Sequence, residues 1–206
     1  MEPRSVLVLL VDDEPDVTNA LSWLLDSVKL RSRAFNSPRA FLDALCDVPQ
    51  PACAVLDLRM PEMSGLELQV KMAEMGLDFP HLFLSAHGDV PAAVRAMQGG
   101  AVNFLQKPFN PEEFLNAVQK IVRIARERYE SQTRERDLKD LLERLSGREA
   151  DVLGELVRGR TSKEIARALA ISPKTVDAHR ANIIRKLDVR NVVDLVRMVQ
   201  KLHSQP

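Results

Sequence analysis

The chain has 206 residues, which is enough for one large domain or two small ones. Its 29 Lys and Arg balance its 29 Asp and Glu, so the net charge alone argues against a nucleic-acid partner. The balance hides an asymmetry, because residues 1–120 hold 10 basic against 16 acidic side chains, whereas residues 146–206 hold 12 against 7. The two ends are therefore expected to have different electrostatic roles, and two domains are the better interpretation.

Membrane and zinc-binding classes are not favoured. The longest apolar run, residues 6–11, is far too short to cross a bilayer, and the first residues do not resemble a signal peptide. Cys46 and Cys53 form neither a CxxC pair nor part of a His/Cys cluster, so no zinc site is expected. We expect a soluble, cytoplasmic protein without a membrane partner.

The first part of the chain predicts five strand–helix units. Strands are predicted at residues 5–11, 30–35, 53–58, 80–85 and 101–105. Residues 5–11 form a continuous apolar run typical of a parallel strand buried on both faces, whereas residues 30–35 give a weaker strand signal. A helical pattern follows each predicted strand, and proline or a capping serine marks several of the helix starts. Five such units in a row predict an α/β fold with a doubly wound, five-stranded parallel sheet.

The second part of the chain predicts only helices. Residues 126–137 are almost wholly polar and lack Gly and Pro, which is typical of a solvated helical linker that extends the fifth helix. Capping patterns predict further helices that begin at Ser146, Thr161 and Ser172, and Asn191 is expected to cap a fourth. Only two residues separate the second of these helices from the third, which is the spacing of a helix-turn-helix.

Polar side chains stand where four of the five predicted strands end. The carboxyl ends of parallel strands share one edge of the sheet, so these side chains are expected to converge: Asp12, Asp13, Asp57, Ser85 and Lys107. Clustered carboxylates repel one another unless a cation is bound, and oxygen ligands beside a phosphoryl group suit Mg²⁺. A lysine and a hydroxyl opposite the acids complete an anion site. The pattern predicts phosphoryl chemistry on Asp57.

Motifs at the same strand ends resemble the receiver domain of two-component response regulators over about residues 5–122. They are Val11-Asp-Asp-Glu14, Leu56-Asp-Leu-Arg-Met-Pro61, Ser64-Gly65, Ser85-Ala-His-Gly-Asp89 and Lys107-Pro-Phe109. The resemblance implies a flavodoxin-like sheet of order 2-1-3-4-5, and it implies that Asp57 accepts a phosphoryl group from a sensor histidine kinase. It assigns Mg²⁺ to Asp13, Asp57 and the Arg59 carbonyl, with Asp12 helping to position the metal. It assigns Lys107 to the phosphoryl group, and Ser85 and Phe104 to a switch. His87, a lone loop histidine, is left out of the site.

The helix expected over residues 172–187 has two distinct faces. Val176, Ile183 and Leu187 form an apolar stripe, and the opposite face is short and basic. That outward face holds Lys174, Ala178, Ala181, Asn182 and Arg185. A solvated helix surface would have a similar pattern, so charge alone favours DNA binding only modestly.

Further motifs resemble the four-helix, LuxR-type DNA-binding domain over about residues 141–203. They are Leu145-Ser-Gly-Arg-Glu149, Gly159, Ser162-Lys-Glu-Ile-Ala166, Ile171-Ser-Pro-Lys-Thr-Val176, His179-Arg180 and Lys186-Leu187. The whole chain resembles the FixJ subfamily, with a receiver at 1–122, a helical linker at 123–140 and a DNA-binding domain at 141–206. The resemblance implies DNA contacts from Lys163, Lys174, Thr175, Asp177, Ala178, His179, Arg180, Ala181, Arg185 and Lys186. The basic residues of this set, with His179, would mostly contact phosphates, and Asp177 would be able to accept from a cytosine amino group. Many relatives carry basic or larger side chains at Asp177, Ala178 and Ala181, so these residues predict no operator.

The two resemblances together predict a phosphorylation-controlled transcription factor, not an enzyme. It would dimerise when phosphorylated, bind double-stranded promoter DNA, act with RNA polymerase and activate transcription more readily than repress it. One alternative is a Mg²⁺-dependent phosphohydrolase, which would leave the basic helices without a purpose. The other is a constitutive DNA-binding regulator, which would have no use for an electrostatically expensive acidic cluster.

Overall fold

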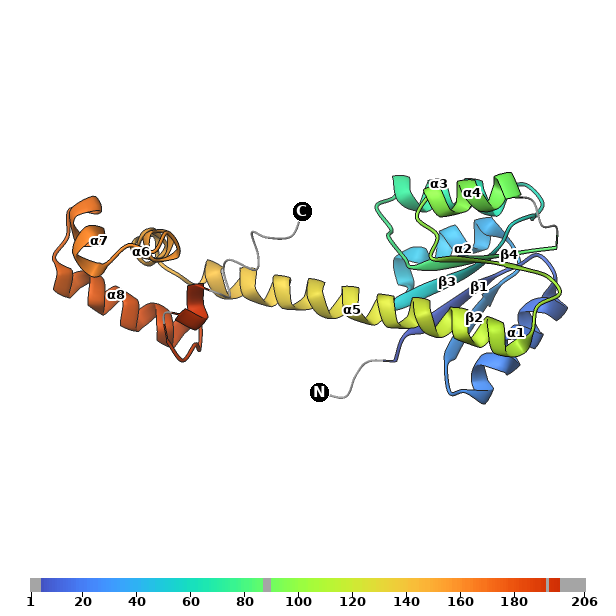
Figure 1. Ribbon diagram of the computed structural model, residues 1–206, viewed down its shortest axis with the longest axis horizontal. Helices are drawn as coiled ribbons and strands as arrows, with labels where there is room; N and C mark the ends of the chain where they lie inside the picture. The colour runs from blue at the N-terminus through green and yellow to red at the C-terminus, as the bar shows by residue number, and fades with distance from the viewer. Residues whose placement is uncertain (1–4, 87–89, 192, 197–206) are drawn as a thin grey trace. The chain divides into compact units, whose positions relative to one another are not determined.

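A computed structural model describes residues 5–86, 90–191 and 193–196 of the chain (Figure 1). The chain divides into two compact units, Met1–Glu130 and Ser131–Pro206. Each unit has its own hydrophobic core. None of the described helices is both long enough and apolar enough to span a membrane.

The first unit is built on a five-stranded, wholly parallel sheet. Its strands are β1 (Leu7–Val11), β2 (Arg31–Phe35), β3 (Ala52–Asp57), β4 (His81–Ser85) and β5 (Asn103–Gln106). Their order is β2-β1-β3-β4-β5, which confirms the predicted fold class and strand order. Strands β1, β3 and β4 are buried along their whole length, whereas the edge strand β2 is mostly exposed.

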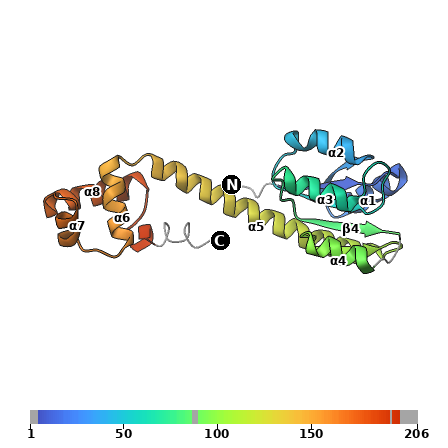
Figure 2. The same cartoon turned by 90° about the horizontal axis from the view of Figure 1, so that it is seen from above.

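Helices cover both faces of this sheet, as Figure 1 and Figure 2 show. Their bounds are α1 (Pro15–Ser27), α2 (Pro38–Ala44), followed by the short 3-10 helix Leu45–Asp47, α3 (Gly65–Glu74), α4 (Val90–Gln98) and α5 (Pro111–Glu143). Buried side chains of α2, α3 and α4 pack on one face, and those of α1 and α5 pack on the other. This is the layering of a doubly wound sheet, in which every strand end of the site lies on one edge.

Helix α3 buries only part of its apolar pattern. Leu66, Leu68, Val70 and Met72 alternate along it, but only Leu68 and Met72 are buried, and Val70 is 56% exposed. Residues four apart share one helix face, whereas residues two apart do not.

Helix α5 is continuous from Pro111 to Glu143 and passes through the predicted linker. An ion pair of 2.7 Å between Lys139 Nζ and Glu135 Oε1 lies on its polar part, one turn apart. The stretch expected to be a solvated helix is therefore helical. The residue limits of the three segments, 1–122, 123–140 and 141–206, stay a prediction.

The second unit contains α6 (Gly147–Val157), α7 (Ser162–Ala168) and α8 (Pro173–Lys186). Each begins at a predicted capping residue, because Ser146, Thr161 and Ser172 accept a hydrogen bond from a backbone N–H of the first turn. Asn191 Oδ1 likewise accepts from Asp194 N at 2.9 Å, and a helical turn covers residues 193–196. The rest of that predicted helix lies outside the described residues.

Candidate functional site

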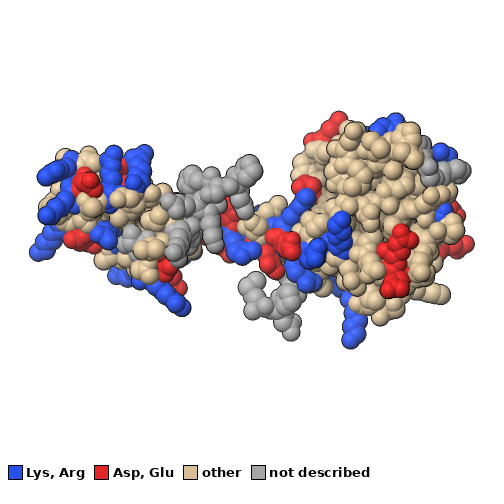
Figure 3. Space-filling view, in the orientation of Figure 1, with Lys and Arg blue, Asp and Glu red and all other residues tan. Residues whose placement is uncertain are grey.

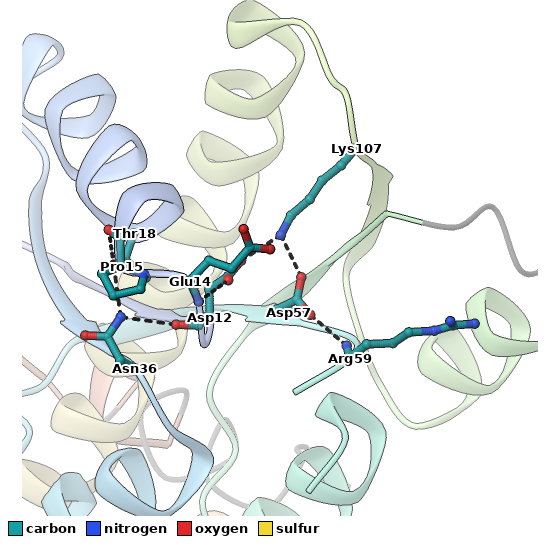
Figure 4. A network of polar contacts seen from close by, with 8 residues as sticks. All are labelled: Asp12, Glu14, Pro15, Thr18, Asn36, Asp57, Arg59 and Lys107. Carbon is teal, nitrogen blue, oxygen red and sulfur yellow. Dashed lines mark hydrogen bonds and ion pairs between the residues drawn. The ribbon is translucent and has the colours of Figure 1, made fainter. Parts of the chain in front are cut away.

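The predicted strand-end cluster forms at the carboxyl edge of the sheet. Lys107, just after β5, places Nζ 2.7 Å from Asp12 Oδ2 and 2.7 Å from Asp57 Oδ1 (Figure 4). The side chains are 19%, 3% and 9% exposed respectively, so this three-way ion pair is largely removed from water. Residues from β1, β3 and β5 that are far apart in sequence thus meet as expected.

Both carboxylates of the ion pair are also held by backbone amides. Asp57 Oδ2 accepts from Arg59 N at 2.7 Å, and Asp12 Oδ1 accepts from Glu14 N at 3.0 Å. Each aspartate therefore offers one oxygen to Lys107 and one to its own loop, which fixes the rotamer of both.

Asn36 supports the acidic loop and was not predicted. Its Nδ2 donates to the Asp12 carbonyl oxygen and to Thr18 Oγ1, each at 3.3 Å, and the Thr18 hydroxyl donates to the Pro15 carbonyl at 3.0 Å (Figure 4). These bonds tie the end of β2 to the start of α1. The only signal in the sequence is its place: Asn36 directly follows the second predicted strand, as Asp12 directly follows the first.

This cluster carries more acid than base. Burial raises the pKa of Asp57, and Lys107 and the Arg59 amide offset only part of that effect. Burial would lower the pKa of Lys107, but the hydrogen bonds and charges of Asp12 and Asp57 outweigh it, so that pKa is raised. Two carboxylates share one ammonium group, and the half-buried Asp13 follows Asp12 in the chain.

This donor set suits a hard cation in its chemistry, since it offers carboxylate oxygens and surplus negative charge. In the described part of the chain, however, no three acidic, imidazole or thiol side chains are grouped closely enough to hold a metal by themselves. A metal here would need backbone carbonyl or water ligands as well, which is consistent with the predicted use of the Arg59 carbonyl.

Ser85 and Phe104 lie on neighbouring strands. Ser85 ends β4 and is buried, and its carbonyl accepts from Lys107 N at 2.6 Å. Phe104 lies in register with Phe83 of β4 and packs, half-buried, against the core under α2, α3 and α4. The predicted switch roles of Ser85 and Phe104 stay predictions, and His87 lies outside the described residues.

The candidate DNA-binding face is the outer surface of α7 and α8. Val176, Ile183 and Leu187 are buried, which confirms the predicted inward stripe. The exposed residues of the predicted set are Lys163, Lys174, Thr175, Asp177, Ala178, Ala181 and Arg185, while His179, Arg180 and Lys186 are half-buried. Figure 3 shows Lys and Arg side chains spread over the visible face of this unit.

Lys186 differs from the other predicted contacts because it is bound within its own domain. Its Nζ lies 2.6 Å from Glu149 Oε2 and 3.2 Å from the Arg144 carbonyl oxygen. Glu149 is buried, and the same Oε2 accepts from Ser146 N at 2.8 Å in the capping box of α6. These bonds lower the pKa of Glu149 to about 2, and the hydrogen bond from Lys186 is the largest cause. The geometry favours a structural role for Lys186 over a phosphate contact.

Replacing Glu149 by glutamine tests this role. Glutamine can still accept from Ser146 N, but it leaves the Lys186 ammonium group without a counter-charge, so we expect the second unit to lose about 2 kcal/mol of stability at neutral pH. Because folding lowers the pKa of Glu149, the wild type should lose that contribution as pH falls from about 4.5 towards 2, whereas the variant should not. Hydrogen exchange of α6 amides measures both effects. Equal pH dependence in the two proteins would contradict the assignment.

Comparison with known proteins decides the family. Residues 8–119 match the response regulator receiver domain, and residues 143–199 match the luxR family of bacterial regulatory proteins. The chain belongs to the response regulators. The response regulator protein TmoT of Ectopseudomonas mendocina is 43% identical over 204 residues, which cover 98% of this chain and 91% of that protein. The transcriptional regulatory protein FixJ of Bradyrhizobium diazoefficiens is 36% identical over 194 residues, 94% of each chain.

A solved structure shows that this response regulator is also similar in three dimensions over nearly its whole length. The structure of the response regulator StyR has a TM-score of 0.84 and 38% sequence identity, and the match covers 96% of this chain and all of that one. The family is regulatory rather than enzymatic, which removes the phosphohydrolase alternative. A receiver domain implies a sensor kinase as partner, and a LuxR-type domain implies DNA binding.

Proposed function

We propose that a sensor histidine kinase transfers a phosphoryl group from its phosphohistidine to Asp57, and that this transfer controls DNA binding by the second unit. The observation that carries the proposal is the contact of Lys107 Nζ with Asp57 Oδ1 at 2.7 Å. A cation held there can stay beside the oxygens of a phosphoryl group added to Asp57 and neutralise part of their charge. Asp57 also ends β3 at the carboxyl edge of the sheet, which is the edge where sheets of this kind bind their ligands.

Asp13, Asp57 and the backbone carbonyl of Arg59 would hold Mg²⁺, and Asp12 would help to position it. Bound Mg²⁺ would neutralise phosphoryl oxygens during transfer. The surplus of carboxylates over ammonium groups supports this assignment, as does the oxygen-only chemistry of the donors. Lys107 would offset the repulsion between Asp12 and Asp57 before transfer, and between Asp12 and the phosphoryl oxygens after it.

Ser85 and Phe104 would link phosphorylation of Asp57 to dimerisation and DNA binding. The Ser85 hydroxyl would turn towards the new phosphoryl oxygens, and Phe104 on the adjacent strand would move into the space that it leaves. The phosphorylated receiver at 1–122 would dimerise, and the domains at 141–206, joined to it by the helical linker at 123–140, would bind two half-sites of promoter DNA. Contact with RNA polymerase and activation of transcription are part of the proposal. Because promoter DNA on the chromosome would be its target, the protein would act in the cytoplasm.

The test compares the wild type with Asp57→Asn, using acetyl phosphate and Mg²⁺ as the phosphoryl donor system. We expect the wild type to gain one phosphoryl group that hydroxylamine removes, to dimerise and to bind a promoter-fragment library more tightly. An asparagine side chain lacks the nucleophilic carboxylate, so the variant should show none of the three changes. Mass spectrometry, light scattering and gel mobility measure them.

The same experiment distinguishes phosphorylation control from the remaining alternative, a constitutive DNA-binding regulator. A constitutive regulator whose receiver is only a scaffold would bind DNA equally with and without the donor, and Asp57→Asn would bind like the wild type. That result would contradict the proposal, as would labelling of Asp57 that leaves both dimerisation and DNA binding unchanged.

A further inference from the structure

A small polar network joins the start of α7 to the second turn of α8. Asp177 Oδ1 accepts a hydrogen bond from Ser162 Oγ at 2.9 Å, and Ser162 Oγ accepts one from Arg180 Nη1 at 2.6 Å. Arg180 Nη1 also lies 3.6 Å from Asp177 Oδ1. The single proton of the Ser162 hydroxyl is directed at Asp177, so the network holds the carboxylate in one orientation.

The Asp177 carboxylate is held on one side and open on the other. Its side chain is 64% exposed, and within the described residues no hydrogen bond to Oδ2 is found. The exposed neighbours Ala178 and Ala181 end at Cβ, so they cannot project past this carboxylate. An acidic acceptor thus stands on α8, where the other exposed charged side chains, Lys174 and Arg185, are basic.

In a helix-turn-helix, residues near the start of the second helix reach base edges in the major groove. There a carboxylate can only accept, and the base edges offer two donors, the N4 amino group of cytosine and the N6 amino group of adenine. Adenine places the N7 acceptor beside its amino group, which repels a carboxylate, whereas no acceptor of the same base lies beside the cytosine amino group. Guanine and thymine edges offer only acceptors.

We propose that Asp177 is a specificity-determining residue that selects cytosine at one position of each DNA half-site, and that Ser162 is its positioning residue. This inference rests on the proposed DNA-binding function and adds the base that the site selects. The competing role for Asp177 is structural, as a partner that links Arg180 and Ser162 across α7 and α8. A structural role alone would leave the base preference unchanged when Asp177 is replaced.

The test is selection from a random double-stranded DNA library by the full chain, with acetyl phosphate and Mg²⁺ present. The wild type is expected to prefer cytosine by about 5- to 10-fold over other bases at one position of each half-site. Asp177→Ala should lose this preference. Asp177→Asn should replace it by adenine, because an asparagine amide pairs with adenine N6 and N7. Ser162→Ala should weaken the preference, since the carboxylate is then free to rotate.

Lys174→Ala is the matched control, because Lys174 is exposed one turn before Asp177 on the same helix. It should weaken binding to all sequences alike and leave the selected sequence unchanged. The slope of the logarithm of the binding constant against the logarithm of salt concentration should fall in magnitude by about 1, because one phosphate contact is lost. Selected sites in which cytosine persists with Asp177→Ala, or wild-type sites without such a cytosine, would overturn the inference alone. Failure of the wild type to select any DNA would overturn the proposed function and the inference with it.

Discussion

Replacing Lys107 by methionine is expected to lower the free energy of unfolding of the first unit by about 3 kcal/mol at neutral pH. Lys107 is the cation between two largely buried carboxylates, at 2.7 Å from each. Methionine fills a similar volume but leaves Asp12 and Asp57 facing each other without a counter-charge. The loss of one partner from a buried ion pair costs more than the pair contributes, because the remaining charge stays desolvated.

This loss should depend on pH in a defined direction. Burial already raises the pKa of Asp57 above its ordinary 3.8, and the hydrogen bond and charge of Lys107 are the main opposing causes. Without them that pKa rises further, so the folded variant holds a proton on Asp57 up to a higher pH than the unfolded chain does. A group of this kind destabilises the fold increasingly as pH rises from near 3.8 through the folded pKa. The gap between variant and wild type should therefore be wider at neutral pH than near pH 4.

Hydrogen exchange of the β3 and β4 amides at the two pH values measures this gap. Lys71→Met is the matched control, because Lys71 is exposed on α3 and should change stability by less than about 0.5 kcal/mol. Lys107→Arg should retain much of the stability, since it keeps the charge. An equal loss for Lys107→Met at both pH values would show that packing, not charge, is the main role of the side chain.

The parts of this structure that sequence predicts well are those set by local pattern. Residues 6–11 form one apolar run because β1 is covered on both faces, and all six are buried. The edge strand β2 gave a weaker signal, since most of its side chains face solvent. Asp12, Asp57 and Lys107 could be placed together because parallel strands present all their carboxyl ends at one edge.

The missed features depend on contacts between distant residues. Nothing near Asn36 in the sequence points to the Asp12 carbonyl, which lies 24 positions away. Lys186 has the same basic character as its neighbours on α8, yet it meets Glu149, 37 positions away, instead of facing outwards. Periodicity assigns a side chain to a face of its own element, but only tertiary packing determines its partner.

Two glycines in the same sequence pattern illustrate that limit. Ser64-Gly65-Leu66-Glu67 and Ser146-Gly147-Arg148-Glu149 both form capping boxes with glycine at the first helical position. A Cβ on Gly147 would meet nothing within 4 Å. A Cβ on Gly65 would lie 2.2 Å from the Asp57 carbonyl oxygen and 2.9 Å from Phe83 Cε1. The start of α3 therefore packs directly on the backbone of the candidate phosphoryl acceptor, and Gly65 N donates to the Leu58 carbonyl at 3.0 Å.

Gly65→Ala is accordingly expected to destabilise the first unit by about 2–4 kcal/mol, and Gly147→Ala to leave the second unit unchanged or up to about 1 kcal/mol more stable. The methyl group added to Gly65 meets backbone and an aromatic ring, neither of which can move aside cheaply, so α3 or the end of β3 must shift. A shift of β3 moves Asp57 away from Lys107 Nζ, and phosphoryl labelling by acetyl phosphate should fall together with stability. Hydrogen exchange of α3 and α6, measured in both variants, gives the comparison, because the two substitutions share chemistry, helix position and cap. If the two variants lose stability equally, the loss comes from replacing glycine at the first helical position. Close packing of α3 on Asp57 would then not be its cause.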